Sequence, residues 1–531
     1  MTNEHEHASP LIEPLDEHNR RLLESVHPPD WRNPEPKDRY HLVVIGAGTA
    51  GLVSAAVAAG LGARVALVER HLMGGDCLNV GCVPSKSVIR AARAWHAARS
   101  GAAFGAPVAA GDGDFAAAME RMRRLRAGLS PVDGAARFRD LGVDVFLGHG
   151  RFTGPATVEV GGATLRFRRA VIATGARAAA PPIAGLAEAG YLTNETVFSL
   201  TERPARLAVV GAGPIGCELA QAFARLGSRV TLFDVAPQVL IREDADAAKV
   251  VQDALVRDGV ELVLGASITE VRSRQAASDA AGGMPEAGAI SRDGAGSGER
   301  VIAWERSGER HETACDAILV GVGRAPNVED LGLEAAGVAY DRTGVGVDDK
   351  LRTSNPRIFA AGDIAPSLKF THLADAHAAI VVQNAFFFGR ARHTRLVVPW
   401  VTYTSPEIAH VGMYEQDARA AGQATQVITV PLHDVDRAIL DGEEEGFLRL
   451  VLAAGKDRIL GATLVAEHAG EMIGELALAI THRIGLARIA STIRPYPTQG
   501  EVLKKAANQW RKGKLTPTVR KIFELWFRAF R

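Results

Sequence analysis

Two of the four cysteines in this 531-residue chain lie close together in a short segment rich in glycine. The segment reads GGDCLNVGCVPSK (residues 74–86) and places Cys77 five positions before Cys82. Thiols at this spacing could exchange electrons through a reversible disulfide, pack as small buried side chains, or supply half of a zinc site. Zinc would need a second ligand pair, and the predicted helix after Cys82 would stabilise a thiolate at its N-terminus. Redox exchange is therefore favoured.

The composition of the whole chain argues against several other classes of function. Lys and Arg together number 61, as do Asp and Glu, so the net charge is zero and no nucleic-acid partner is indicated. The start, MTNEHEHASP, lacks the basic and apolar regions of a signal peptide, and we expect a cytoplasmic location. Cys217 and Cys315 fall in a predicted helix and a predicted strand, where we expect core packing. No metal-binding residues are predicted.

One pattern of strand, glycine turn, helix and strand occurs twice. Residues 39–69 and 206–234 each contain an apolar strand, a GxGxxG turn, a helix and a second strand that ends in an acid. These residues are Gly46, Gly48, Gly51 and Glu69 in the first copy, and Gly211, Gly213, Gly216 and Asp234 in the second. The same number of residues separates the first glycine from the acid in both copies, which argues against chance.

Each copy of this pattern suits a dinucleotide. The first glycine allows a tight turn, the second lets the backbone approach a pyrophosphate, and the third lets helix and strand pack closely. The phosphates lie at the helix N-terminus and the acid accepts from ribose hydroxyls. Two such sites and a cysteine pair suggest electron transfer between a nicotinamide, a flavin and thiols. Asp234 would repel a 2′-phosphate, so NADH is favoured over NADPH, although nearby Arg242 leaves NADPH open.

With these motifs the chain resembles the FAD-dependent pyridine nucleotide–disulfide oxidoreductases, which include glutathione reductase, dihydrolipoamide dehydrogenase and mercuric reductase. The resemblance covers about residues 40–508 and rests also on the motifs ATG (173–175), GVGRAPN (321–327) and AAGD (360–363). It implies an α/β fold with two Rossmann-like domains, which bind FAD and NAD(P), and a C-terminal α+β dimerisation domain. In these motifs the implied cofactor-binding residues are Thr174, Gly175, Gly323 and Asp363, of which Asp363 binds the ribityl and pyrophosphate region.

The resemblance also implies roles for residues around the cysteines. Cys77 corresponds to the interchange thiol that meets the external substrate, and Cys82 to the thiol nearer the flavin. Lys86 and Glu218 correspond to an ion pair beside the flavin ring, although each alone could be an ordinary solvated helix charge. His372 opens the helix that faces the pyrimidine edge of the flavin, where it could contact the flavin or simply cap the helix.

The C-terminal motif departs from glutathione and lipoamide reductases, which carry His-Pro-Thr-x-x-Glu. This chain has YPTQGE, from Tyr496 to Glu501. In the family the histidine reaches the other subunit's cysteine pair and moves protons to the interchange thiol. Tyrosine, with a pKa near ~10, is a poor proton shuttle at neutral pH, so a soft metal ion such as Hg(II) is favoured over a disulfide. Mercuric reductase is similar in having tyrosine here, but its vicinal C-terminal cysteines and its N-terminal CxxC have no counterpart among the four cysteines.

The motifs and composition divide the chain into successive segments. We expect an extended N-terminal arm (1–39), an FAD-binding domain in two parts (40–190 and 322–394), an NAD(P)-binding domain (191–321), a dimerisation domain (395–508) and a C-terminal helix (509–531). The segment 274–299, rich in Gly, Ala and Ser, is expected to be a flexible insertion in the NAD(P)-binding domain. Because the Tyr496 loop serves the other subunit, activity should require a homodimer.

The end of the chain has the pattern of a basic amphipathic helix. In LTPTVRKIFELWFRAFR, the apolar residues at helical spacing are Val519, Ile522, Phe523, Trp526, Phe527 and Phe530, and the basic residues, mostly elsewhere on the helix, are Arg520, Lys521, Arg528 and Arg531. Residues 516–531 could contact a membrane surface. Docking on the helix's own domain or on the dimer partner is the slightly favoured alternative.

Together these features predict a homodimeric, FAD-containing NAD(P)H oxidoreductase of the mercuric reductase-like kind. Its predicted catalytic residues are Cys77, Cys82, Lys86, Glu218, Tyr496 and Glu501, acting on a small-molecule metal-ion or disulfide acceptor. A dihydrolipoamide dehydrogenase-like enzyme and a membrane-associated redox sensor are the alternatives. The expected location is cytoplasmic, at the inner face of the membrane if the C-terminal helix binds lipid.

Overall fold

The computed structural model describes residues 12–274, 298–366 and 368–530. These residues form two compact units. The first comprises residues up to 212, 222–233 and 266–395, and the second comprises 213–221, 234–265 and 396 onwards. Both units combine helices with strands, and the first contains largely parallel sheets, which confirms the predicted α/β class. The predicted domain boundaries stay predictions.

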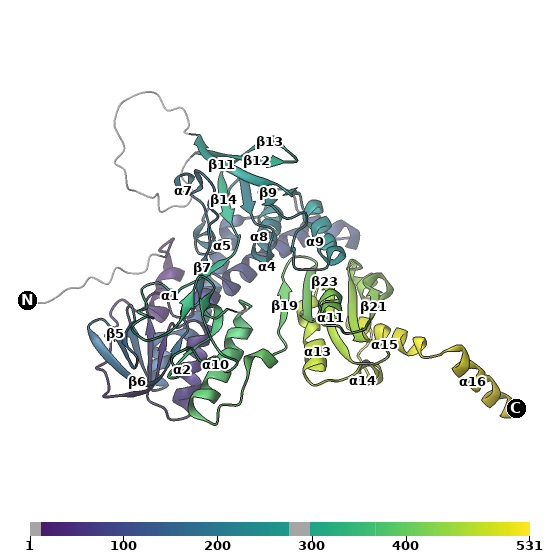
Figure 1. The fold of residues 1–531 in the computed structure, drawn as a ribbon. Coiled ribbons are helices and arrows are strands. Elements are labelled where there is room, and N and C mark those ends of the chain that lie inside the picture. Colours follow the sequence, from purple (N-terminus) through teal and green to yellow (C-terminus); the bar gives the residue numbers. More distant parts are fainter. Residues whose placement is uncertain (1–11, 275–297, 367, 531) are drawn as a thin grey trace, which may run out of the picture. The chain divides into compact units, whose positions relative to one another are not determined.

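A largely parallel sheet forms the core of the first unit (Figure 1). Its strand order is β3-β2-β1-β6-β5-β4, with β18 also paired to β6. The strands are β1 (Tyr40–Ile45), β2 (Val65–Glu69), β3 (Val143–Leu147), β4 (Arg151–Gly154), β5 (Thr157–Val160), β6 (Ala163–Ile172) and β18 (Ile358–Ala360). Only the pairs β4–β5 and β5–β6 are antiparallel. Strands β1 and β2 are continuous apolar runs with almost every residue buried, as expected where helices cover both faces of a parallel sheet.

Helices α2 (Thr49–Gly60) and α10 (Thr371–Phe386) pack against each other beside this sheet (Figure 1). The other elements around it are α3 (Gly75–Asn79), α4 (Cys82–Ser100), η1 (Gly101–Phe104), α5 (Phe115–Leu129), η2 (Ser130–Asp133), α6 (Ala135–Asp140), β7 (Ala176–Ala178), β15 (Arg324–Pro326), β16 (Tyr340–Asp341), β17 (Gly344–Val345), η4 (Gly362–Ile364) and η5 (His393–Arg395). Since α2 follows β1 and α10 follows β18, both helices begin at the carboxyl edge of the parallel strands, where ligands bind in such sheets.

A second set of parallel strands follows in the first unit. Strand β8 (Arg206–Val210) lies between β9 (Arg229–Asp234) and β14 (Ala317–Val320), and it pairs in parallel with both. Elements α7 (Leu186–Ala189) and η3 (Val197–Ser199) precede it, and β11 (Ser267–Arg274), β12 (Glu299–Arg306) and β13 (Glu309–Cys315) form an antiparallel sheet. The flexible insertion predicted for 274–299 is therefore wrong at its ends, since residue 274 closes β11 and residue 299 opens β12. Residues 275–297 lie outside the described part.

The N-terminal segment is not wholly extended, so the predicted arm is wrong for its middle part. Residues Glu17–Val26 form helix α1, and Asp16 caps it by accepting from the amide of Asn19 at 2.8 Å. Leu22 and Val26 are fully buried in α1, which packs against α5. A capping aspartate followed by apolar residues at helical spacing was the available sequence signal, hidden among prolines and charges.

A buried arginine joins helix α1 to the cysteine segment. Arg126 on α5 donates to the carbonyl oxygen of Asn79 at 2.6 Å and to Oδ1 of Asn19 at 2.8 Å. All three residues are buried, and burial lowers the pKa of Arg126 to about 10. Asn79 in turn donates to the carbonyl oxygens of Met73 and Gly75. This network holds the turn that carries Cys77.

The second unit is centred on an antiparallel sheet in the order β19-β20-β23-β22-β21 (Figure 1). Its strands are β19 (Pro399–Thr402), β20 (Glu407–Gly412), β21 (Thr425–Pro431), β22 (Phe447–Ala453) and β23 (Ile459–Ala466). The associated helices are α11 (Glu415–Ala420), η6 (Leu432–Asp434), α12 (Asp436–Asp441), α13 (Ala469–Thr481), α14 (Leu486–Ser491) and α15 (Glu501–Gly513). Apolar residues of the sheet, α13, α14 and α15 form one buried core. The unit also contains α9 (Ala245–Arg257), β10 (Val260–Leu264) and the first part of α8 (Pro214–Arg225).

The C-terminal segment divides into two helices, so the predicted single helix over 509–531 has the wrong start. Residues 509–513 belong to α15, and a separate helix, α16 (Pro517–Ala529), follows after a short connection. No residue of α16 is buried in the described chain. Of the slightly favoured expectation, docking on its own domain or on the dimer partner, the first half is therefore contradicted and the second stays a prediction. Among the described residues, no helix is long and apolar enough to cross a bilayer.

The Arg126 network predicts a large effect of one substitution. Arg126→Met should lower the free energy of unfolding by roughly 1–3 kcal/mol, because it leaves two buried oxygen atoms without a donor. Arg124→Met, at an exposed position of the same helix, is the matched control and should have little effect. Urea unfolding of the FAD-loaded protein, followed by circular dichroism, measures both. Equal losses in the two variants would contradict the network's role.

Candidate active site

The first glycine turn lies between β1 and α2 and is closely packed. Gly46 has a φ of +102°, and a Cβ there would lie 2.3 Å from the carbonyl oxygen of Ala173. A Cβ on Gly51 would lie 1.8 Å from the carbonyl oxygen of Gly46. Gly48 is the N-cap of α2 and provides no side-chain hydrogen bond to the helix. The turn thus presents backbone N–H groups at a helix N-terminus, as a phosphate site requires.

Glu69, at the end of β2, holds this turn in place. Its Oε2 accepts from the amide of Ala47 at 2.6 Å and its Oε1 accepts from the amide of His71 at 2.8 Å. Burial raises the pKa of Glu69, while these two hydrogen bonds oppose the rise. Each carboxylate oxygen keeps a further lone pair, so binding a ribose hydroxyl, the role predicted for Glu69, is compatible with this geometry.

The cysteine segment lies directly against the same turn. The amide of Gly74 donates to the carbonyl oxygen of Ala47 at 2.8 Å. A Cβ on Gly75 would lie 2.7 Å from Cα of Gly48, so only glycine allows this approach. Two motifs that the sequence identified separately, the glycine turn and the cysteine segment, are therefore neighbours in the fold.

The ATG and GVGRAPN motifs are joined by reciprocal hydrogen bonds. The Thr174 hydroxyl donates to the carbonyl oxygen of Asn327 at 2.9 Å, and the Asn327 side-chain amide donates to the carbonyl oxygen of Thr174 at 2.8 Å. The amide of Asn327 also donates to Gly175. Gly175 and Gly323 both have positive φ, at +67° and +140°. The predicted cofactor-binding residues of these two motifs are thus brought together by backbone turns that favour glycine.

Asp363 lies in η4, immediately after β18, beside two cationic side chains. Its carboxylate is 3.6 Å from Nε of Arg324, and its carbonyl oxygen accepts from Nζ of Lys369 at 2.6 Å. Burial raises the pKa of Asp363, and these two cations oppose the rise. Arg324 also donates to Asp76 and to the carbonyl oxygen of Ala176, but its buried Nε has no hydrogen-bond partner in the described chain.

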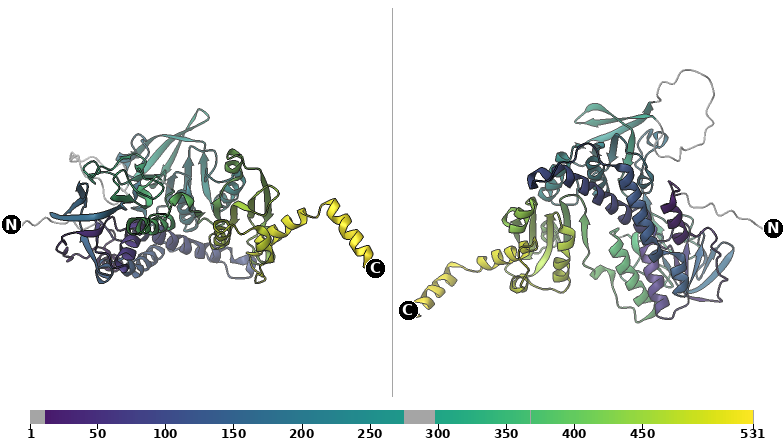
Figure 2. Two further views of the ribbon diagram at one scale, coloured as in Figure 1. Left: turned by 60° about the horizontal axis from the view of Figure 1, so that its bottom comes forward. Right: turned by 180° about the vertical axis from the view of Figure 1, so that it is seen from behind.

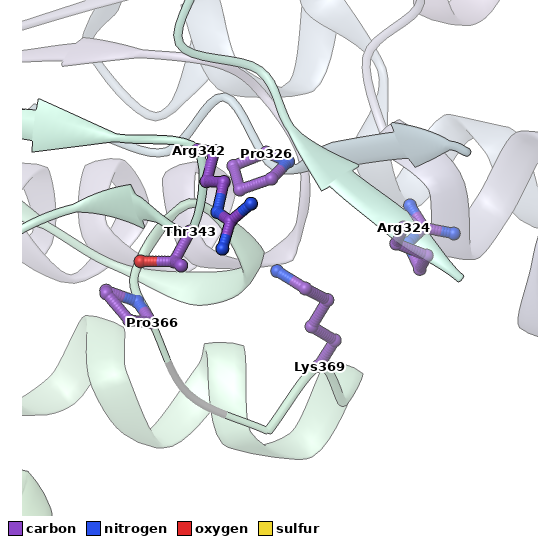
Figure 3. Close-up of a pocket in the computed structure, with 6 residues that line it drawn as sticks. All are labelled: Arg324, Pro326, Arg342, Thr343, Pro366 and Lys369. Carbon is purple, nitrogen blue, oxygen red and sulfur yellow. The ribbon is translucent and has the colours of Figure 1, made fainter. Parts of the chain in front are cut away.

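A cationic cavity of about 510 Å³ lies beside this cluster (Figure 3). It is lined by Arg324, Pro326, Arg342, Thr343, Pro366 and Lys369. Figure 3 shows the nitrogen-bearing ends of Arg342 and Lys369 turned toward each other. Such a cavity suits an anionic or hydroxyl-rich part of a ligand.

These features together fit FAD, the cofactor that the family resemblance implies. The uncapped N-terminus of α2 suits a pyrophosphate, Glu69 suits a ribose, and the unpartnered Nε of Arg324 beside Asp363 suits an oxygen-rich chain. The close packing at Gly46 and Gly51 leaves no room for side chains where such a ligand would approach.

The two cysteines lie at the junction of two helices. Cys77 is in α3, and Cys82 is the first residue of α4, whose N-cap is Gly81. Neither cysteine forms a disulfide bond within the described chain; Cys82 is exposed and Cys77 is less so. A hydrogen bond with Cys82 raises the pKa of the Cys77 thiol, and burial and the Cys82 charge raise it further. Cys82 lies at the positive end of a long helix, a position that favours a thiolate.

Two residues that sequence reasoning missed support this site from α10. Thr371, the first residue of α10, places its Oγ1 3.3 Å from the sulfur of Cys82. His377, buried six residues further along, accepts from the amide of Gly362 through Nδ1 at 3.3 Å. Burial lowers the pKa of His377 to about 4, which keeps the ring neutral. His372 stacks on Phe370 at 5.3 Å between ring centroids, and Phe370, not His372, is the N-cap.

The second glycine turn repeats part of the geometry of the first. Gly211 has a φ of +104°, and a Cβ there would lie 2.8 Å from the carbonyl oxygen of Gly321. Gly213, Gly216 and Asp234 belong to the second unit, where Oδ1 of Asp234 accepts from the amide of Ala236 at 2.8 Å. The role of these residues in NAD(P) binding stays a prediction.

The predicted ion pair between Lys86 and Glu218 joins residues of different units and stays a prediction. Lys86 lies on α4, one turn after Cys82. Glu218, on α8, is buried, and its Oε1 accepts from the amide of Tyr403 at 2.9 Å. The simpler reading of Glu218 as a solvated helix charge is therefore wrong. Cys217 and Cys315 are both buried, as core packing requires.

The Tyr496 loop of the second unit exposes its tyrosine. The Tyr496 side chain is 70% exposed, and its hydroxyl donates to Oδ2 of Asp436 at 2.9 Å. This hydrogen bond raises the pKa of Tyr496, so the phenol stays protonated at neutral pH. Glu501 begins α15, and its buried Oε2 has no hydrogen-bond partner among the described residues. Sequence reasoning missed Asp436, because sixty residues separate it from the tyrosine.

Comparison with protein families matches two parts of the chain. The pyridine nucleotide-disulphide oxidoreductase family matches residues 40–380. The dimerisation domain of the same family matches residues 398–507. Together the matched parts contain the glycine turns, the cysteine segment and the Tyr496 loop.

Several characterised proteins are similar over most of their length. Mercuric reductase from Lysinibacillus sphaericus is 34% identical over 472 residues, which are 89% of this chain and 82% of the relative. Dihydrolipoyl dehydrogenase from Thermus scotoductus is 33% identical over 89% of this chain and 98% of the relative. The structure of the HOCl-induced flavoprotein disulfide reductase RclA from Escherichia coli matches with a TM-score of 0.76 and 27% identity, covering 88% of this chain and 99% of RclA. RclA has also been solved as a Cu(II) complex.

The neutral state of His377 predicts a loss of stability in acid. The unfolded histidine binds a proton near pH 6.5, and the folded one only near pH 4. Unfolding therefore takes up a proton between these values, and stability falls as the pH drops from about 6.5 to 4. His377→Asn, which keeps an acceptor but cannot be protonated, should reduce this fall, whereas the exposed His433→Asn should not. Urea midpoints of the FAD-loaded protein at pH 7 and pH 5 test this; equal falls in all three proteins would refute it.

Proposed function

Because the chain belongs to the pyridine nucleotide-disulphide oxidoreductase family, whose members are FAD-dependent and use NAD(P)H, we propose that Cys77 and Cys82 are its redox-active pair and that a soft metal ion is its acceptor. The observation that carries the proposal is the hydrogen-bonded thiol pair at the α3–α4 junction. FAD would supply two-electron transfer between NAD(P)H and this pair. Hg(II) is the test case among soft metal ions.

Each thiol has a distinct task in this proposal. Cys82, held at the N-terminus of α4 and contacted by Thr371, carries the negative charge of the reduced pair. Cys77 keeps its proton until an acceptor arrives, because losing it would place two negative charges side by side. Once Cys77 is deprotonated, the two thiolates can bind a soft metal ion together.

The proton balance favours a metal ion over a disulfide. The net reaction Hg²⁺ + NAD(P)H → Hg⁰ + NAD(P)⁺ + H⁺ releases a proton. Reduction of a disulfide, RSSR + NAD(P)H + H⁺ → 2 RSH + NAD(P)⁺, consumes one and needs a proton donor for the leaving thiolate. The hydrogen bond to Asp436 raises the pKa of Tyr496. Tyr496 is therefore a poor proton donor to the leaving thiolate, and a still poorer route for returning protons. The similarity to mercuric reductases supports the same choice.

The remaining predicted residues complete the proposal. Glu218 and Lys86 would form the ion pair beside the flavin, and His372 would face its pyrimidine edge. Asp234 favours NADH over NADPH as the donor. The dimerisation domain indicates a homodimer, in which Tyr496 and Glu501 would serve the cysteine pair of the other subunit. We place the enzyme in the cytoplasm, where thiols stay reduced.

A disulfide acceptor is the second candidate, favoured by the similarity to a dihydrolipoyl dehydrogenase. A redox sensor is the third, favoured by the exposed helix α16. Turnover distinguishes them: a lipoamide reductase turns over lipoamide rapidly, and a sensor turns over every acceptor slowly.

The first test counts reactive thiols and then compares acceptors. In the oxidised enzyme, alkylation and mass spectrometry should find neither Cys77 nor Cys82 reactive, and one equivalent of NADH without oxygen should make both reactive. Cys82→Ala should abolish this NADH-dependent change, whereas Cys315→Ala, at a buried cysteine, should preserve it. Steady-state NADH oxidation should then be fast with Hg(II)–thiol complexes and slow with lipoamide. Fast lipoamide turnover, or no Hg(II)-dependent turnover, would overturn the metal assignment and leave the thiol assignment standing.

The tyrosine argument predicts a gain of activity from one substitution. Tyr496→His should raise lipoamide reduction by about tenfold or more, because general acid–base catalysis typically contributes 10²–10⁴-fold. Hg(II) reduction should change much less. Tyr496→Phe keeps the ring and removes the hydroxyl, so it is the matched control and should leave lipoamide reduction low. If Tyr496→His fails to raise lipoamide turnover while the cysteine pair still reacts with NADH, the proposed role of the missing histidine is wrong.

A further inference from the structure

Helix α16 is a complete helix that nothing in the described chain covers. Thr516 caps it by accepting from the amide of Val519, and Pro517 occupies its first turn. Figures 1 and 2 show it continuing beyond α15, apart from the five-stranded sheet of its own unit. None of its residues is buried. A helix of this length is marginal in water by itself, so it needs a surface.

One side of α16 is apolar and largely aromatic. Its exposed side chains there include Ile522 (60%), Phe523 (47%), Trp526 (57%), Phe527 (64%) and Phe530 (71%). Phe523 stacks on Phe527 and Trp526 lies against Phe530. A contiguous apolar stripe of this kind, unlike a single exposed apolar side chain, marks an interaction site.

The other side of α16 and the turn before it are basic. Lys521 and Arg528 are exposed opposite the apolar stripe and Arg520 is exposed at its border, with Glu524 the single acid of the helix. Arg511, Lys512 and Lys514 add exposed positive charge at the end of α15. The chain as a whole is neutral, so this concentration of charge at one end is specific to the segment.

Helix α16 is not needed to complete the fold or the family's dimerisation domain. The match to that domain ends at residue 507. Helix α15 supplies the last residues of the buried core of the second unit, which are Val502, Leu503, Ala506 and Ala507, and Trp510 packs against this core. A second copy of the chain would be expected to meet the surfaces inside the matched domain, where Ile493 and Tyr496 are exposed, and not a helix that lies beyond it.

We propose that α16 is a peripheral anchor that lies in the surface of an anionic phospholipid bilayer. Aromatic side chains on one face and basic side chains on the other match the boundary between acyl chains and negative headgroups. A helix of thirteen residues is shorter than the roughly 20 residues needed to span a bilayer, so it lies along the surface. In a homodimer two such helices act together, which strengthens weak individual binding.

The anchor would bring the enzyme to the inner face of the membrane without changing its chemistry. It rests on observations independent of the cysteine pair, so the anchor can fail while the reductase proposal stands. Removal of residues 514–531 should leave NADH-dependent thiol reduction in solution unchanged, because the buried core of the second unit includes no residue of this segment.

Vesicle cosedimentation of the full-length, FAD-loaded protein tests the anchor. Vesicles of 30% phosphatidylglycerol in phosphatidylcholine should bind the protein, and pure phosphatidylcholine should bind it weakly. High salt should weaken binding to the anionic vesicles. Arg520→Gln with Lys521→Gln should lower the partition coefficient about 25-fold, since each basic residue near such a surface contributes about fivefold. Phe523→Ser with Phe527→Ser should lower it at least as much.

Matched substitutions elsewhere control for general changes in charge and hydrophobicity. Arg166→Gln with Arg168→Gln removes two charges from strand β6, and Phe388→Ser removes an aromatic side chain that is 95% exposed. Neither should alter vesicle binding. If the wild type does not bind anionic vesicles, or if these controls lower binding as much as the α16 variants, the anchor is refuted. Loss of the dimer on truncation, measured by analytical ultracentrifugation, would instead assign α16 to the second copy.

Discussion

The close approach of Cys77 to Cys82 depends on the tight junction between helices α3 and α4. Gly81 makes the junction possible, since a Cβ there would lie 2.8 Å from the carbonyl oxygen of Asp76. The same junction starts a long helix at Cys82, so the thiol pair and the helix dipole that favours a thiolate at Cys82 come from one structural feature. Gly74 and Gly75 then fix this feature against the first glycine turn, and the thiols cannot move independently of the proposed flavin site.

Residues distant in sequence keep that arrangement rigid. Arg126 hydrogen-bonds both the turn that carries Cys77 and helix α1. His377 accepts a hydrogen bond from the amide of Gly362 in the AAGD motif. Both are buried, and burial lowers both pKa values. Among the described residues, Arg126 has no carboxylate within hydrogen-bonding distance, and His377 is a neutral ring. Buried polar groups of this kind stabilise a fold only when every partner is in place, so we expect the proposed site to be sensitive to substitutions of these two residues.

The two ends of the chain extend the family's domains in different ways. Helix α1 packs into the first unit and supports the cysteine turn, so it is part of the framework of the proposed site. Helix α16 packs on nothing in the described chain and carries the segregated charge and aromatic residues of an interfacial helix. Helix α1 thus contributes to the stability of the first unit, and helix α16 is proposed to determine where the protein is located.

From the sequence alone, the glycine turns, the cysteine pair, the ATG, GVGRAPN and AAGD motifs and the class of cofactor could be predicted, because each depends on local backbone geometry that few residue types allow. The amphipathic pattern of the last helix was equally local. The sequence could not reveal Arg126, Thr371, His377 or Asp436 as supporting residues, because each acts on a group that only the folded chain brings near it. Tertiary structure likewise decided that the N-terminal segment folds as a helix, since its apolar residues needed α5 as a surface before helix formation became favourable.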